Sequence, residues 1–315
     1  MTKDTLFAIG EALIDFIPAE SGCDFSDVTA FSPKVGGAPA NVLGAFARLG
    51  GRTQLLTQLG EDPFGHKIAG ELSAFGIGTD NVVFTDRANT ALAFVSLGRD
   101  GDRTFSFYRK PSADMLYTEE MAAAVDFSRA YALHFCSVSL GDFPMKAAHR
   151  RAIAAAKAAG AIISFDPNLR FPLWSDPEAL RAAVREFLPV ADLLKVSEEE
   201  VPFITGCDDP ARGCESLLAT SPLVLCTCGA SGAWAYTRRG GVFVPAAPVV
   251  AKDTTGAGDA FCGSFLWQLY RAGYTASTLG DISREELEIF LTRSNAYCGK
   301  SVQHPGAIAS YPTQL

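Results

Sequence analysis

The chain has 315 residues, of which 48% are hydrophobic and 20% charged, and its formal net charge is −8. This composition is typical of a globular protein with a large apolar core, and the acidic balance argues against a nucleic-acid-binding surface. No stretch approaches the 18 consecutive apolar residues of a membrane span, and we expect no signal peptide. The eight cysteines form no C-x-x-C pair and no metal-ligand spacing, so we expect a cytoplasmic protein with reduced thiols.

The first hundred residues predict two kinds of strand. Buried strands are expected at 6–10 and 54–58, and a helix should begin at Asp62-Pro63 and end before Gly76. Segments 12–34 and 91–110 differ, because the first is irregular and the second is an alternating hairpin with a Gly/Asp turn at 98–102. We expect these two segments to form a small β-sheet that stands off the main body as a lid, within one domain spanning residues 1–315.

From about residue 131 onward, strands and helices alternate. Strands are expected at 132–138, 161–165, 193–196 and 223–227. One helix is expected at 145–159, where Gly160 ends it. A second should follow Asp176-Pro177, and a third should follow a capping box that begins at Ser283. Strands that lack polar alternation and are joined by helices indicate a parallel sheet covered on both faces. The predicted fold class is α/β, with three α/β/α layers, a mostly parallel central sheet and the small β-sheet lid.

The most informative segment is the glycine loop at 252–261, which leaves an apolar run and enters a helix expected at 260–271. Gly256 and Gly258 leave the backbone bare, so that N–H groups at the helix start can face an anion. A carboxylate at Asp259 would repel a resident phosphate, but it suits a base that takes a proton from an attacking hydroxyl. The alternative is that Asp259 only caps the helix after a tight turn.

The sequence D-T-T-G-A-G-D-A-F at 253–261 resembles the carboxy-terminal signature of the ribokinase-like (PfkB) carbohydrate kinases. The resemblance implies that Gly256, Ala257 and Gly258 bind the transferring phosphoryl group and that Asp259 is the catalytic base. It also implies that Asp253 and Thr255 match positions that bind a monovalent cation, such as K⁺, in some relatives.

Two further motifs resemble the sugar-binding side of that family. Gly36-Gly37-Ala38-Pro39-Ala40-Asn41 is similar to its G-G-x-x-A-N motif, in which the glycines admit a ligand and the Asn41 amide can bind vicinal hydroxyls. The alternative is an ordinary junction between a loop and a helix at 42–49. Asp15 lies in an apolar run, where an unpaired carboxylate is costly unless a sugar diol or a structural salt bridge satisfies it.

The lid and a later loop narrow the resemblance to fructokinases. Segment 103–109, followed by Ser112-Ala113-Asp114, resembles the fructokinase lid strand, so Phe105 or Tyr108 could cover the sugar. For Phe107 we expect ordinary packing on the body or across a dimer. Segment 165–170, with Trp174, resembles fructokinases and ketodeoxygluconate kinases, which implies that Arg170 binds substrate or phosphate.

The nucleotide side contains no phosphate loop of the Walker type, although segment 60–67 imitates its spacing. Segment 195–200 aligns with the family's N-x-x-E motif, with Ser197 in place of Asn. The resemblance assigns Lys195 to the nucleotide and Glu200 to Mg²⁺ through waters. For Glu198 and Glu199 we expect only an acidic first helical turn. The remaining nucleotide-binding positions implied by the resemblance are Thr227, Gly229 and Gly232 in a T-x-G-x-x-G turn, whose alternative is a plain strand-to-strand turn, and Asn295 near adenine.

The resemblance implies an ATP-dependent sugar kinase that uses Mg²⁺, with fructokinase first among the candidates. Ketodeoxygluconate kinase, aminoimidazole riboside kinase and ribokinase stay open, as does a sensor that has lost catalysis. A nicotinamide-dependent oxidoreductase is disfavoured, because no G-x-G-x-x-G follows the first strand. The expected partners are a small sugar and ATP, without nucleic acid or membrane, and by family analogy a second copy bound through the lid.

Overall fold

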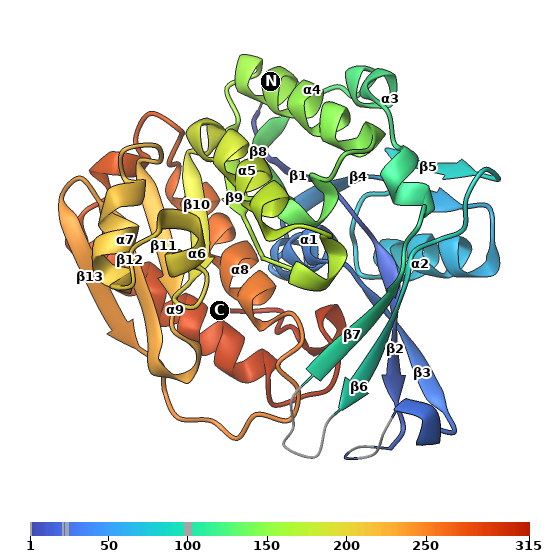
Figure 1. Ribbon diagram of the computed structural model, residues 1–315. Coiled ribbons are helices and arrows are strands. Elements are labelled where there is room, and N and C mark those ends of the chain that lie inside the picture. Colours follow the sequence, from blue (N-terminus) through green and yellow to red (C-terminus); the bar gives the residue numbers. More distant parts are fainter. Residues whose placement is uncertain (1, 21, 23–24, 98–102) are drawn as a thin grey trace.

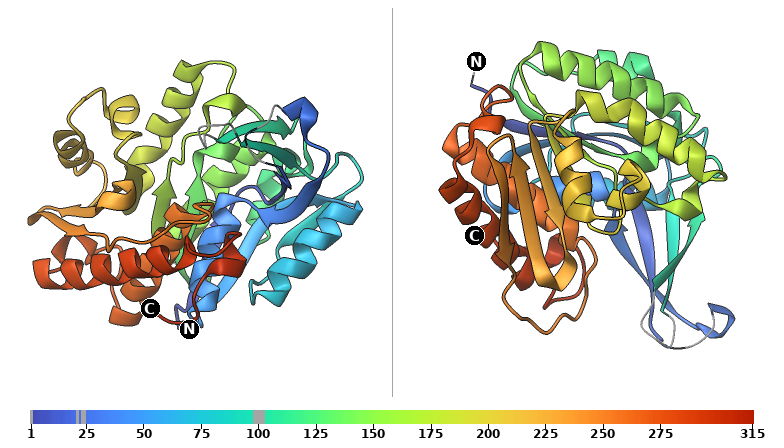
Figure 2. Two further views of the ribbon diagram at one scale, coloured as in Figure 1. Left: turned by 90° about the horizontal axis from the view of Figure 1, so that it is seen from below. Right: turned by 60° about the vertical axis from the view of Figure 1, so that its left-hand side comes forward.

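The computed structural model describes residues 2–20, 22, 25–97 and 103–315, and its larger part is a nine-stranded sheet between two layers of helices (Figure 1; Figure 2). In sheet order the strands are β13 (Gly240–Pro245), β12 (Gly232–Thr237), β11 (Leu223–Thr227), β10 (Leu193–Ser197), β9 (Ile162–Asp166), β8 (Ala130–Cys136), β1 (Thr5–Ile9), β4 (Arg52–Gly60) and β5 (Val82–Thr85). All pairings from β11 to β5 are parallel, whereas β12 and β13 add an antiparallel edge. The predicted mostly parallel sheet is confirmed.

The helices cover both faces of this sheet. One layer contains α1 (Ala38–Arg48), α2 (Pro63–Ala74), α8 (Ala257–Ala272) and α9 (Arg284–Ser301), and the other contains α3 (Glu119–Ala123), α4 (Pro144–Ala158), α5 (Pro177–Phe187), α6 (Val201–Thr205) and α7 (Pro210–Leu217). In β1, Leu6 and Ala8 pack into the first core, while Phe7 and Ile9 pack into the second. Both faces of the strand are therefore buried, which explains why it lacks polar alternation.

The residues predicted to begin and end helices do so in the structure. Asp62 caps α2 by accepting hydrogen bonds from the first-turn amides, and Asp176 caps α5 in the same way. Ser283 and Glu286 form the predicted capping box of α9. Gly160, with φ 79°, follows α4 in the left-handed conformation that favours glycine. Local chemistry therefore sets these boundaries to within a few residues of the predictions.

A second, four-stranded sheet projects from the main body at the lower right of Figure 1. Its order is β3 (Phe31–Gly36), β2 (Leu13–Pro18), β6 (Leu92–Leu97) and β7 (Arg103–Tyr108). These strands come from the two segments predicted to form a separate small sheet, and that part of the fold prediction is confirmed. The predicted turn at 98–102 lies outside the described residues. We call this element the small sheet.

The register of the small sheet decides which side chains share a face. Asp15 pairs with Ala93, and Ala93 pairs with Phe107, so these three residues lie on one face. Phe107 packs against an apolar cluster of Leu13, Ala91 and Ala93. Within the described part of the chain, no helix combines the length and the apolar character needed to cross a bilayer.

Candidate active site

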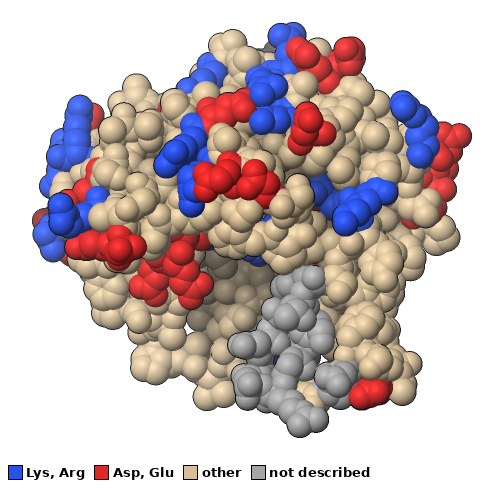
Figure 3. Space-filling model, viewed as in Figure 1, with Lys and Arg blue, Asp and Glu red and all other residues tan. Residues whose placement is uncertain are grey.

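The residues predicted to carry function gather at the carboxyl ends of the parallel strands, where open α/β sheets place their ligands. Two adjoining cavities of about 480 and 340 Å³ lie there. They share Thr227, Gly229, Thr254, Ala257 and Gly258 as lining residues. On the face shown in Figure 3 the surface is hollowed beside the small sheet, and acidic side chains gather at one side of the hollow.

The first turn of α8 borders both cavities. Gly256 is the residue before the helix, with φ 72° in the left-handed region, and a side chain there would collide with the Tyr311 hydroxyl. That hydroxyl donates a hydrogen bond of 2.8 Å to the Gly256 carbonyl oxygen. The helix begins at Ala257, three residues before the predicted start at 260, because the glycine turn itself leads directly into the helix. The positive end of the helix dipole therefore faces the cavities.

Asp259 is buried in this first turn but does not cap the helix. Its Oδ2 accepts a hydrogen bond of 2.9 Å from Nδ2 of Asn41, which lies on α1. The capping interpretation is therefore wrong, since Gly256 occupies the cap position. Burial raises the pKa of Asp259 to about 6, while the Asn41 amide and the positive charges of Lys195 and Arg170 limit the rise.

The Asp15 side chain lies beside Gly36, the first of the two glycines predicted to bind the sugar. A side chain on Gly36 would collide with the Asp15 carboxylate, and a Cβ on Gly37, which has φ 116°, would lie 2.5 Å from the Glu11 carbonyl oxygen. Among the described residues Asp15 has no hydrogen-bond or ion-pair partner, and Arg170 acts on it only through its charge, so no salt bridge is found there. Burial raises the pKa of Asp15 to about 7, and the charge of Arg170 opposes this rise.

Lys195 occupies the space between β9 and the glycine turn. Its Nζ lies 3.0 Å from Oδ2 of Asp166, and both side chains are buried. A Cβ on Gly258 would lie 3.1 Å from the same Nζ. Asp166 is absent from the predicted site residues, although its place at the end of a buried strand was a usable signal. The ion pair holds the Lys195 ammonium group next to the first turn of α8.

Arg170 and Glu200 lie in two neighbouring loops, which follow β9 and β10 and are joined by hydrogen bonds. Arg170 lines the smaller cavity, and its Nη1 donates to the Leu169 carbonyl oxygen at 3.1 Å. The Glu200 carboxylate accepts hydrogen bonds from the backbone N–H of Leu169 at 2.6 Å and from that of Ser197 at 2.8 Å. Each carboxylate oxygen therefore already binds the chain, so Glu200 holds the Arg170 loop to the end of β10. A water-mediated role toward Mg²⁺ stays a prediction.

The neighbouring acidic residues differ from expectation. Glu198 and Glu199 were expected in the first turn of a helix, but α6 begins only at Val201, so they lie in the preceding turn. Both line the smaller cavity. The helix starts later because Pro202, which has no N–H to donate, occupies a first-turn position.

The predicted nucleotide-binding residues lie together. Thr227, Gly229, Gly232 and Asn295 all line the larger cavity. The turn that contains the glycines also connects the antiparallel strands β11 and β12, so the strand-to-strand interpretation is correct as well. Asn295 donates from Nδ2 to the Val244 carbonyl oxygen at 2.9 Å, which fixes α9 to β13.

The loop before α8 is held by Asp253. Its Oδ1 accepts from the backbone N–H of Thr255 at 2.9 Å and from the Thr255 hydroxyl at 2.7 Å. Its Oδ2 accepts from the Gly306 N–H at 2.8 Å, which ties the loop to the carboxy-terminal segment. The monovalent-cation role of Asp253 and Thr255 stays a prediction.

The aromatic residues of β7 require a correction. Tyr108 pairs with Leu92 and its ring packs on Phe94, so it lies on the face opposite Asp15 and is 62% exposed. The prediction that Tyr108 covers the sugar is therefore wrong for this arrangement. Phe107, for which ordinary packing was expected, shares the Asp15 face. The side chain of Phe105 lies outside the described part of the chain.

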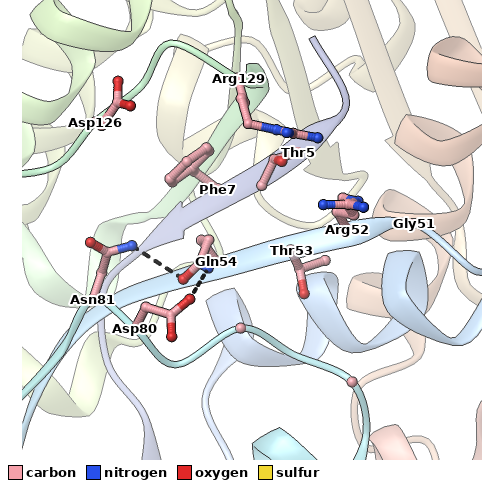
Figure 4. Close-up of a pocket in the computed structure, with 12 residues that line it drawn as sticks. Thr5, Phe7, Gly51, Arg52, Thr53, Gln54, Asp80, Asn81, Asp126 and Arg129 are labelled. Atoms are coloured by element: carbon pink, nitrogen blue, oxygen red, sulfur yellow. Dashed lines mark hydrogen bonds between the residues drawn. The ribbon is translucent and has the colours of Figure 1, made fainter. Parts of the chain in front are cut away.

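Another hollow, of about 480 Å³, lies at the amino ends of β1 and β4 (Figure 4). There the Gln54 amide donates to Asp80 at 2.7 Å and accepts from Asn81 at 3.1 Å. Arg129 at its edge is paired with Asp4. None of the predicted site residues lines this hollow, and it lies at the wrong end of a parallel sheet for catalysis.

A parallel α/β sheet with a glycine turn and a buried carboxylate at its carboxyl edge is an arrangement suited to phosphoryl transfer to an alcohol. The model of the pfkB family carbohydrate kinases matches residues 3–314 of this chain. The chain therefore belongs to the PfkB family of carbohydrate kinases, which are phosphotransferases.

Known proteins similar to this chain are consistent with that membership. It is 41% identical over 315 residues to Fructokinase-1 of Oryza sativa subsp. japonica, covering 99% of this chain and 96% of the relative. The crystal structure of fructokinase with bound ATP from Xylella fastidiosa aligns with a TM-score of 0.89 and 36% identity, covering 98% of this chain and 95% of that one. A double-mutant fructokinase from Vibrio cholerae O395, in fructose, ADP and potassium ion bound form, aligns with a TM-score of 0.86 and 31% identity over 99% of this chain and 96% of that one.

Proposed function

We propose that this protein is a fructokinase, which transfers the γ-phosphoryl group of ATP to a hydroxyl of fructose. The observation that carries the proposal is the buried Asp259 carboxylate, bound to Asn41 on one side and adjoining the glycine turn of α8 on the other. Several similar proteins named fructokinase, at about 40% identity, support the choice of sugar.

In this proposal Asp259 takes the proton of the attacking sugar hydroxyl. With a pKa of about 6 it is mostly ionised at neutral pH, yet it is basic enough to accept a proton in the transition state. Asp15, Gly36, Gly37 and Asn41 hold the sugar. Positioning of the two substrates and neutralisation of charge supply most of the rate in phosphoryl transfer.

In this proposal the phosphates of ATP are bound by the backbone of the glycine turn and by two basic side chains. Gly256, Ala257 and Gly258 offer the positive end of the α8 dipole, and Lys195 and Arg170 add positive charge beside it. The adenosine part of ATP fits the larger cavity, between the turn at Thr227 and Asn295. The adenosine part of ATP is thus assigned to the larger cavity and its phosphates to the smaller one.

Metal ions are expected to accompany the nucleotide. Because the oxygens of Glu200 already accept backbone hydrogen bonds, this residue fits a water-mediated contact to Mg²⁺ better than direct ligation. Mg²⁺, when bound, neutralises phosphate charge. Asp253 and Thr255 are the proposed residues near a monovalent cation, in keeping with the potassium ion named for the Vibrio cholerae enzyme.

We assign the whole chain to one kinase domain in which the small sheet acts as a lid over the sugar. Closure of such a lid would keep water from competing as the phosphoryl acceptor. The face opposite Asp15 exposes Tyr108 and Phe25, which are 62% and 42% accessible. Exposed aromatic rings are typical of protein interfaces, which supports a homodimer through the small sheet.

The test is a panel of fructose, ribose, 2-keto-3-deoxygluconate and aminoimidazole riboside, assayed with MgATP for ADP release and for the phosphorylated product. We expect the highest kcat/KM with fructose. A preference for another sugar would assign a different member of the same class. ATP binding without any phosphorylated product would indicate a sensor that has lost catalysis.

A further inference from the structure

A buried chain of polar groups connects the small sheet to the main body. Arg109 donates from Nη2 to the Ser139 hydroxyl at 3.1 Å, and that hydroxyl donates to Oε2 of Glu11 at 3.0 Å. Arg109 also donates from Nε to Oδ2 of Asp114 at 3.0 Å and from Nη1 to the Val138 carbonyl oxygen at 3.0 Å. Every side chain of this group is nearly inaccessible, with Arg109 the most exposed at 7%. We call Glu11, Ser139, Arg109 and Asp114 the hinge cluster.

Two members of the hinge cluster lie where the chain enters and leaves the small sheet, and a third lies on the main sheet. Glu11 lies between β1 and β2, and Arg109 directly follows β7. Ser139 belongs to a short 3-10 turn, Ser137–Ser139, at the carboxyl end of β8 in the main sheet. The Ser139 hydroxyl therefore joins the segment that leads into the small sheet and the segment that leaves it to the main sheet.

Because the hinge cluster is buried, it restricts how the two connecting segments can be arranged. A buried guanidinium or carboxylate is stable only when partners satisfy its hydrogen bonds, so the cluster tolerates few arrangements of the two connecting segments. Burial raises the pKa of Glu11, and the nearby charge of Arg109 opposes the rise. The network thus favours one orientation of the small sheet relative to the main sheet.

The hinge cluster also lies next to the proposed sugar site. The Glu11 carbonyl oxygen is 2.5 Å from the position that a Cβ on Gly37 would occupy, and β2, which carries Asp15, begins two residues after Glu11. A small rotation at Glu11 would therefore displace Asp15 and Gly37 together. We propose that Glu11, Ser139 and Arg109 are positioning residues that fix the small sheet, and with it Asp15, over the sugar. This inference rests on the proposed function of the same site.

Ser139→Ala tests the proposal with little change in volume. A matched control is Ser137→Ala, because Ser137 lies in the same turn, is equally buried, and has a hydroxyl without a partner in the described chain. Ser139→Thr keeps a hydroxyl and should restore the wild-type values. We expect Ser139→Ala to raise the KM for fructose about 10-fold and to change the KM for ATP less than about 2-fold.

Two further readouts separate positioning from general stability. We expect Ser139→Ala to release more ADP per sugar phosphate formed, because a misplaced small sheet admits water. We also expect faster amide hydrogen exchange in β2 and β6 than in Ser137→Ala, measured without sugar or ATP.

Failure of this proposal can be distinguished from failure of the proposed function. Equal rises in KM for both substrates, or identical kinetics and exchange in Ser139→Ala and Ser137→Ala, would overturn the proposal. Faster exchange in Ser139→Ala supports the positioning role even if the wild-type protein phosphorylates no sugar, a result that would refute the proposed function alone.

Discussion

Asn41 and Asp259 are 218 residues apart in sequence, yet Nδ2 of the amide and Oδ2 of the carboxylate are separated by 2.9 Å. The contact depends on close packing of α1 against α8. A Cβ on Gly263 would lie 2.5 Å from the Val42 carbonyl oxygen and 2.7 Å from Cβ of Ala45, so this glycine lets the helices approach. The packing joins the proposed sugar side of the site to its phosphate side.

The first prediction concerns Asp259→Asn. The amide keeps the size of the side chain but cannot accept the hydroxyl proton, so we expect sugar affinity within a few-fold of wild type. Turnover should fall by about 10³-fold or more. Calorimetric titration with fructose and an ADP-release assay measure the two quantities. An Asp259→Asn enzyme of normal speed would show that another group is the base.

The second prediction concerns the pH dependence of kcat/KM for fructose. Because the proposed base Asp259 must be ionised and its pKa in the ligand-free protein is about 6, kcat/KM for fructose should rise with pH through about 6 and then level off. The Asn41 hydrogen bond favours the ionised form, so Asn41→Ala should raise the pKa and move the acidic limb upward by up to about one pH unit. A limb that stays in place, or moves to lower pH, would contradict the assigned role of the bond.

The third prediction is that Asp15→Asn weakens fructose binding yet stabilises the fold above pH 7. Burial raises the pKa of Asp15 from 3.8 to about 7, so the native state binds more protons than the unfolded state between these values. Ionisation of Asp15 therefore costs the wild-type protein stability as pH rises through that range, and the asparagine variant lacks this contribution.

We expect Asp15→Asn to be more stable at pH 8 by roughly 1–3 kcal/mol. Urea unfolding at pH 8 and at pH 5 measures the difference, which should shrink at the lower pH. A variant that is less stable than wild type at pH 8 would indicate that the carboxylate has a stabilising partner.

The fourth prediction compares two glycine substitutions. A Cβ on Gly258 would lie 3.1 Å from Nζ of Lys195, so Gly258→Ala should narrow the phosphate site and reduce kcat/KM for ATP about 10- to 100-fold. Gly70, inside α2, has open space around it, so Gly70→Ala should leave activity unchanged and stabilise the helix by about 0.5–1 kcal/mol. ATP kinetics and thermal unfolding of both variants provide the comparison. Normal kcat/KM for ATP in Gly258→Ala would place the phosphates elsewhere.

Local sequence signals predicted the main sheet, the small sheet and several helix ends, because buried apolar runs and capping residues act over a few positions. Contacts between distant segments were not predictable in this way. The partnership of Lys195 with Asp166 depends on the order of β9 and β10 in the sheet, which no local pattern specifies. The hinge cluster was missed for the same reason, since Glu11 and Arg109 meet only through Ser139.

The error at Tyr108 has a different cause. Neighbouring residues of a strand point to opposite faces, so a one-position uncertainty exchanges the inner and outer side chains. The sequence predicted the strand β7 but not which of its side chains lie on the same face as Asp15. Only the register through Ala93 assigns Phe107 to the inner face.

The hydrogen bond between α1 and α8 also implies an order in which the site forms during synthesis. During synthesis, the ribosome releases α1 and most of the central sheet long before α8 emerges. A partly made or truncated chain that lacks the last sixty residues would thus have the sugar-facing motifs but neither Asp259 nor the glycine turn. With Asp259 as the proposed base, such a fragment would phosphorylate no sugar, and catalytic competence would arise only when α8 packs against α1.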